Sequence, residues 1–135
     1  SRKVRCDMRY VNSNTMEYEP GYKKLNVYQK ADELVLWVYK ITKKFPKDEL
    51  FGLVSQMRRC AVSVPANIVE GYGRHTVKDK IHFYYMSRGS LNELEYYLDL
   101  AFKLEYMNKN EYNQSTDLRS DVGRLLNGFM KSIDK

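Results

Sequence analysis

The sequence is poor in the residues that mark disulfide-bonded, loop-rich and membrane-spanning proteins. Its 135 residues include only two cysteines, three prolines and seven glycines. Cys6 and Cys60 form neither a CxxC pair nor a zinc-ligand spacing, so we expect two reduced thiols. The longest unbroken apolar run, Leu34–Tyr39, is far shorter than the roughly 20 residues a membrane helix needs, and no apolar signal segment follows the N-terminus. We therefore expect a cytoplasmic protein of one domain, without a membrane partner.

Signatures of catalysis and metal binding are equally scarce. The two histidines, His75 and His82, have no cysteine or carboxylate at a spacing that repeats a known zinc pattern. Gly71 and Gly73 follow a predicted helix and not a strand, so they do not form a phosphate-binding loop. We expect neither an enzyme nor a cofactor nor a metal ion.

From residue 25 onward, apolar residues recur with the 3.6-residue period of amphipathic helices. The pattern predicts helices over about residues 26–44, 47–71, 76–106 and 108–133, and a kink at Pro65 in the second. The residues expected to face the core are, helix by helix, Ala31, Leu34, Val38, Ile41 and Phe45; Leu50, Leu53, Met57, Ala61, Val64 and Ile68; Tyr84, Ser87, Leu91, Leu94, Leu98 and Ala101; and Leu118, Val122, Leu125, Phe129 and Ile133. Four such helices with short connections predict an all-α fold, an antiparallel up-down four-helix bundle over residues 25–135.

Residues 1–24 lack a helical period and form a basic, loosely ordered arm in this interpretation. The net charge is +6, and five of these charges lie before residue 47. Basic residues there are interleaved with tyrosines, a mixture that suits contacts with phosphates and bases, although an ordinary solvated surface explains the charge equally well. The candidate nucleic-acid-binding residues are Arg2, Lys3, Arg5, Arg9, Lys23, Lys24, Lys40, Lys43 and Lys44.

The second and third predicted helices carry apolar residues away from their core faces as well. A monomeric bundle needs one apolar stripe per helix, so a second stripe predicts burial against another copy of the chain. The candidate oligomer-interface residues are Val62, Ala66, Val69, Met86, Tyr96 and Leu100. Between the two sides of the second helix, Arg59, Asn67 and Glu70 are candidates for a hydrogen-bonded network, and Gly89 with Ser90 is expected to let helix backbones approach near Pro65.

Several of these segments resemble a bacterial four-helix-bundle family encoded in intervening sequences of large-subunit rRNA genes and labelled a ribosomal protein. They are LNVYQKA at 25–31, TKKFP at 42–46, ELFGLVSQMRRCAVSVPANIVEG at 49–71 and GSLNELE at 89–95. The resemblance covers about residues 22–133. Val69 and Arg88 depart from the family pattern, which more often has alanine at both positions. The positions that match its motif are Gln56, Arg58, Arg59, Ser63, Pro65, Asn67, Glu70, Gly71, Ser90 and Glu93, and we expect them to hold the bundle or its oligomer together.

The resemblance implies a homopentameric barrel of four-helix protomers. It also implies kinship with the accessory protein of diversity-generating retroelements, which binds RNA and a reverse transcriptase through a basic surface. We therefore expect a non-enzymatic, homo-oligomeric protein that binds RNA through a basic surface as a ribonucleoprotein scaffold. The alternative is a protein-interaction scaffold, an accessory subunit of a reverse transcriptase or another protein, with no nucleic-acid role of its own.

Overall fold

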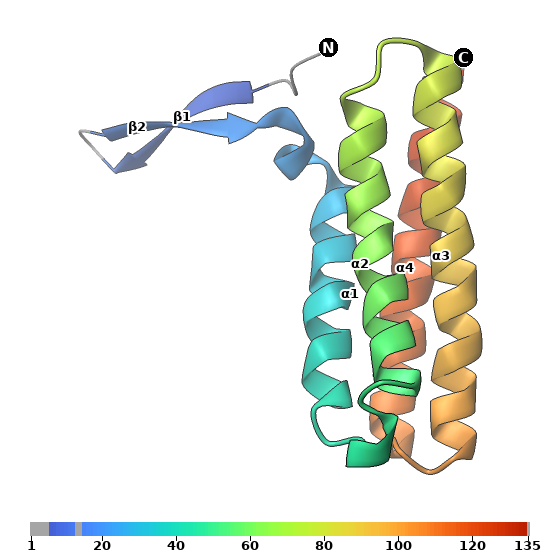
Figure 1. Ribbon diagram of the computed structural model, residues 1–135. Helices are drawn as coiled ribbons and strands as arrows, with labels where there is room; N and C mark the ends of the chain where they lie inside the picture. The colour runs from blue at the N-terminus through green and yellow to red at the C-terminus, as the bar shows by residue number, and fades with distance from the viewer. Residues whose placement is uncertain (1–5, 13–14, 135) are drawn as a thin grey trace.

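The computed structural model describes the backbone of residues 6–12 and 15–134, and side chains from Pro20 to Asp134 (Figure 1). Its body is all-α. The four helices are α1 (Asn26–Thr42), α2 (Leu53–Tyr72), α3 (Val77–Lys103) and α4 (Lys109–Ile133). Short 3₁₀ turns, η1 (Gly21–Lys24) and η2 (Lys47–Glu49), precede α1 and α2. Among the residues described, none of the helices is long and apolar enough to cross a membrane.

The four helices lie side by side, each packed against two others. Helix α1 packs against α2 and α4, and α3 packs against the same two helices on the other side. The α1–α2 and α3–α4 connections lie at one end of the helices, whereas the α2–α3 connection lies at the other end, close to the C-terminus (Figure 1). This arrangement encloses one apolar core and places η2 at the end away from the N-terminal hairpin.

The hairpin was not predicted. Strands β1 (Cys6–Asn12) and β2 (Thr15–Pro20) pair antiparallel, with a register irregularity between Tyr10 and Asn12, and project away from the helices (Figure 1). The signal is present in the sequence, because apolar and polar residues alternate on both sides of a polar turn, as in CDMRY and TMEYE. The expectation of an arm without regular structure therefore overlooked a period of two residues.

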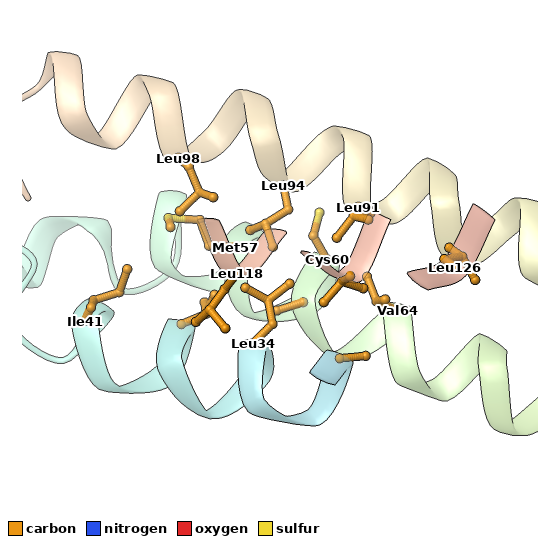
Figure 2. Close-up of a cluster of buried hydrophobic side chains, with 14 of the residues drawn as sticks. Leu34, Ile41, Met57, Cys60, Val64, Leu91, Leu94, Leu98, Leu118 and Leu126 are labelled. Carbon is orange, nitrogen blue, oxygen red and sulfur yellow. The ribbon is translucent and has the colours of Figure 1, made fainter. Parts of the chain in front are cut away.

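The core confirms the predicted inner faces of α1 and α3. All five residues expected from α1 and the following turn are buried, as are all six from α3. Leucines from α1, α3 and α4 surround Met57, Cys60 and Val64 of α2 in the centre of the bundle (Figure 2). Burial of a leucine side chain contributes about 1.5–3 kcal/mol, so this cluster makes a large contribution to the stability of the fold.

Two parts of the predicted core are wrong. Leu50 is 49% exposed, because α2 begins only at Leu53 and the preceding segment is a 3₁₀ turn at the end of the bundle. In α4 the fully packed residues after Val122 are Leu126 and Met130. Leu125, Phe129 and Ile133 pack at the edge of the core and are only partly buried. From Leu118 onward the buried residues of α4 follow one another at steps of four, whereas the prediction took a step of three from Val122 to Leu125.

Side chains cap the N-termini of α3 and α4, whereas the length of α3 differs from the prediction. The Thr76 hydroxyl accepts a hydrogen bond from the Asp79 amide at 3.1 Å, and Asn108 forms a full capping box with Glu111. Helix α3 ends at Lys103, short of the predicted Tyr106. The chain reverses at Glu105, whose φ of 64° lies in the left-handed region that stops a helix.

The close approach of α2 and α3 uses serines in place of Gly89. The Ser87 hydroxyl donates to the Val64 carbonyl at 2.8 Å, and the Ser63 and Ser90 hydroxyls lie 2.8 Å apart. A side chain at Gly89 would meet nothing within 4 Å, so the expectation that Gly89 lets the backbones approach is wrong. Helix α2 runs continuously past the buried Pro65.

Candidate nucleic-acid interface

The structure separates the predicted basic residues into two groups. Lys23 and Lys24 lie in η1 before α1, whereas Lys40 lies in its last turn and is followed by Lys43 and Lys44. Helix α1 has 17 residues, which at 1.5 Å per residue places the groups about 25 Å apart. Arg2, Lys3 and Arg5 lie outside the described residues, and Arg9 is described only as part of the β1 backbone. Among the described side chains, the predicted lysines therefore lie at opposite ends of α1.

Two of the three lysines at the end of α1 are engaged within the bundle. Lys44 pairs with Glu111 of α4, and Lys40 lies over the Trp37 ring at 5.8 Å. Lys43 is exposed beside a hollow formed by α1, η2 and α2. Positive charge and concave shape therefore coincide at this hollow.

We call this hollow the basic groove. It consists of two adjoining cavities of about 460 and 210 Å³ that share Leu50, Val54 and Arg58 in their walls. The cations lining them are Lys43, Lys47, Arg58 and Arg59, and no aspartate or glutamate lines either cavity. The charge of the groove is therefore uncompensated along its walls.

Arg58 is fixed in place across the groove. Its Nε donates to the Thr42 hydroxyl at 3.0 Å, and that hydroxyl in turn donates to the Val38 carbonyl at 2.7 Å. The guanidinium lies 4.6 Å from the centre of the Tyr39 ring, a cation–π contact. Nε and one face of the guanidinium are already engaged in these contacts. The side chain therefore loses little conformational entropy when its terminal nitrogens bind an anion.

The groove also exposes aromatic and aliphatic surface. Phe51, between η2 and α2, is 93% exposed, and Tyr39 is 38% exposed. A surface with exposed rings beside cations can bind a single-stranded nucleic acid, because bases stack on the rings while phosphates pair with the cations. The end of the bundle therefore combines charge, concavity and stacking surface.

Lys47 and Phe51 were not among the predicted site residues, and Arg58 and Arg59 were expected to have a structural role. Residues 47–50 were predicted to form the first turn of a helix with Leu50 in the core, so Leu50 and Phe51 were not expected to be exposed together. The overlooked signal is that Pro46 and Gly52 enclose this pair in a short connection, where little can bury it.

The remaining motif residues lie along the seam between α2 and α3. Asn67 Nδ2 donates to both the carbonyl and the hydroxyl oxygen of Ser63 at 2.9 Å, whereas Glu70 pairs with Arg74 at 2.5 Å. The expected network of Arg59, Asn67 and Glu70 is thus replaced by separate contacts, since Asn67 bonds one turn back and Glu70 bonds one turn forward. Gln56 and Arg59 are exposed.

Glu93, another motif residue, accepts two hydrogen bonds at this seam. The Cys60 thiol donates to Glu93 Oε2 at 3.1 Å and the Tyr97 hydroxyl donates to the same oxygen at 3.2 Å. Burial, followed by the bond to Glu93 and its negative charge, raises the pKa of the Cys60 thiol to about 12. The buried thiol is therefore held protonated in the folded protein.

We expect Cys60 to resist alkylation by iodoacetamide at pH 8. With a pKa of about 12, only about one thiol in 10,000 is ionised at that pH, and the thiolate is the reacting form. Mass spectrometry of the Cys60 peptide measures the rate, with the protein unfolded in urea as the control. Equal rates for folded and unfolded protein would contradict the assigned environment.

The fold and the motif agree with two comparisons. A model of the 23S rRNA-intervening sequence protein family matches residues 23–128. Among solved structures, a protein of unknown function from the S23 ribosomal protein family of Bacteroides thetaiotaomicron superimposes with a TM-score of 0.72 at 24% identity. The match covers 78% of this chain and 95% of that one. No curated protein matches the chain significantly. The match spans nearly all of the four helices, and the chain belongs to the 23S rRNA-intervening sequence protein family.

Proposed function

We propose that this protein is a non-enzymatic, homo-oligomeric RNA-binding protein that acts as a scaffold in a ribonucleoprotein. The observation that carries the proposal is the basic groove, whose walls hold four cations, exposed rings and no carboxylate. Neutralising phosphates releases condensed counterions, so such a surface favours RNA over an uncharged partner. Stacking on Phe51 and Tyr39 favours unpaired bases, whose faces are free.

The groove also fits an RNA strand better than a small substrate. The two cavities adjoin along the end of the bundle, and Arg58 lines both of them. A strand of several nucleotides can place successive phosphates on Lys43, Arg58 and Arg59. We expect such a groove to bind RNA with little sequence preference, because cations and ring faces bind every nucleotide in much the same way.

The experiment that tests the function measures binding of fluorescein-labelled single-stranded RNA by anisotropy from 50 to 300 mM salt. We expect binding at the low end and a linear fall of log affinity with log salt, with a slope of about −0.7 per phosphate contacted. Absence of binding at 50 mM salt, or an affinity that ignores salt, would reject RNA binding. Sequencing the RNA that copurifies with the protein then identifies the natural ligand.

Self-assembly is the second part of the proposal. The protomer, an antiparallel up-down four-helix bundle, leaves Met86 and Tyr96 46 and 62% exposed on the outer side of α3. Val62 of α2, which also lines the basic groove, is 40% exposed. Ala66 is exposed there as well, while Val69 and Leu100 are partly buried. The arrangement we propose is a pentameric barrel, which would repeat the basic groove five times and raise avidity for a long RNA.

Replacing Tyr96 with glutamate should dissociate the assembly without unfolding the protomer. Tyr96 is 62% exposed, so a charge there costs the folded protomer little but cannot be buried at an interface. Light scattering coupled to size exclusion should change from about five times the protomer mass to 16.0 kDa. Leu36→Glu is the control, because Leu36 is equally exposed but lies on α1. A wild-type protein of protomer mass at micromolar concentration would refute assembly.

The alternative, a scaffold that binds only proteins, draws on the same groove. Leu50 and Phe51 are exposed apolar residues that line the groove together with its four cations, which suits an acidic amphipathic helix of a partner such as a reverse transcriptase. A partner retained by the immobilised protein after nuclease treatment, together with absence of RNA binding at 50 mM salt, would favour this function.

A further inference from the structure

A second hollow, of about 380 Å³, lies between α3 and α4 and shares no lining residue with the basic groove. Ile81 and Met130 are its apolar residues, and Tyr85 is its aromatic residue. Its polar residues are Arg88, Asn127, Lys131 and Asp134. The volume falls in the range of small-ligand sites, and the mixture of one ring with several polar groups is typical of such sites.

Arg88 is held over the aromatic wall of this hollow. Its guanidinium lies 4.8 Å from the centre of the Tyr85 ring, and its Nη1 donates to Asn127 Oδ1 at 3.2 Å, which links α3 to α4. Arg88 is partly buried, whereas Tyr85 is 53% exposed. A guanidinium fixed against a ring offers a flat cationic surface, on which a nucleobase stacks as it does on an aromatic side chain.

We propose that this hollow binds one unstacked nucleotide. The base stacks on the Tyr85–Arg88 pair, and the ammonium group of Lys131 together with the remaining Arg88 donors binds the phosphate. Asp134 is the one carboxylate in the hollow. Its negative charge disfavours binding of a bare anion, but it can accept a hydrogen bond from an amino group or ring N–H of the base. This balance of charges selects a nucleotide over inorganic phosphate.

This inference deepens the proposed function, since a nucleotide of a bound RNA strand is the natural occupant, but its test does not depend on the basic groove. Calorimetric titration of the full chain with GMP and with AMP measures the site directly. We expect dissociation constants in the submillimolar to millimolar range, and binding at least about tenfold weaker for ribose 5-phosphate, which lacks the base.

Two variants and two controls assign the site. Arg88→Ala and Tyr85→Leu should each weaken GMP binding about tenfold or more, because each removes one half of the stacking surface. Arg124→Ala, on the exposed side of α4, and Lys103→Ala, in the last turn of α3, should leave it unchanged. Circular dichroism confirms that the variants fold.

The possible outcomes separate the two proposals. Loss of RNA binding in groove variants with intact GMP binding supports both sites. GMP binding in a protein that fails to bind RNA supports the α3–α4 site and rejects the proposed function. No calorimetric signal with either nucleotide at 10 mM, or equal affinity for GMP and ribose 5-phosphate, overturns the nucleotide site. GMP binding that Arg88→Ala does not weaken places the nucleotide elsewhere and also overturns it.

Discussion

The triple variant Lys43→Glu, Lys47→Glu, Arg59→Glu should bind single-stranded RNA at least about a hundredfold more weakly than the wild type at 100 mM salt. Its salt dependence should flatten by about two units of slope, which is the loss of three phosphate contacts at about 0.7 each. All three side chains line the groove and are exposed. Arg58 is left in place because its bond to Thr42 and its contact with Tyr39 join α2 to α1.

The matched control carries the same charge change elsewhere on the bundle. Lys78→Glu, Lys103→Glu, Arg124→Glu alters three exposed cations of α3 and α4 that do not line the groove. If RNA were attracted only by the net charge of +6, both triple variants would weaken binding equally. A large loss in the groove variant alone assigns the interface, whereas equal losses would reject the groove as the binding site.

Gly71→Ala should lower the free energy of unfolding by about 2 kcal/mol. At most helical positions the same change stabilises by up to about 1 kcal/mol, because glycine costs backbone entropy. Here, however, a Cβ atom would lie 2.6 Å from Cε1 of Tyr84 and 3.1 Å from the Lys80 carbonyl oxygen. Tyr84 is fully buried and its ring packs against Phe129 at 5.1 Å, so it has no room to move.

Urea unfolding at a fixed protomer concentration measures this effect. Gly128→Ala is the control, because a Cβ there meets nothing within 4 Å, and it should stabilise by up to about 1 kcal/mol. In a Tyr84→Leu background the penalty for Gly71→Ala should shrink, since the clashing ring is gone. An equal penalty in both backgrounds would show that the clash with Tyr84 is not the cause.

The core of the bundle could be predicted because its signal is local and repeated. Every apolar residue expected on the inner face of α3 is buried, and Asn108 and Glu111 form the capping box that their spacing predicts. The prediction failed where tertiary packing or backbone geometry decides whether a residue is buried. Leu50 has the helical spacing of a core residue, yet it lies in a turn at the end of the bundle and is half exposed.

Only part of the candidate groove was among the residues predicted from the sequence. Lys43 belonged to the expected set and lines the groove, but Lys44 is taken up by Glu111, 67 positions away. Lys47, Arg58 and Arg59 complete the groove from a second helix and its preceding turn. No local pattern could show which cations share a hollow, because that depends on how α1 and α2 pack.

The sequence by itself determined the four amphipathic helices, their capping residues, the family motif and the concentration of positive charge before residue 47. The helices, their capping residues and the motif depend on residues that are only a few positions apart in the sequence. Each helix can therefore be predicted from its own segment. Only the tertiary structure decided which cations are neutralised, which aromatic rings stay exposed and where the two hollows form. The reason is physical, because free charge and concave surface are properties of side chains from different helices brought together by packing, and the sequence lists those side chains far apart.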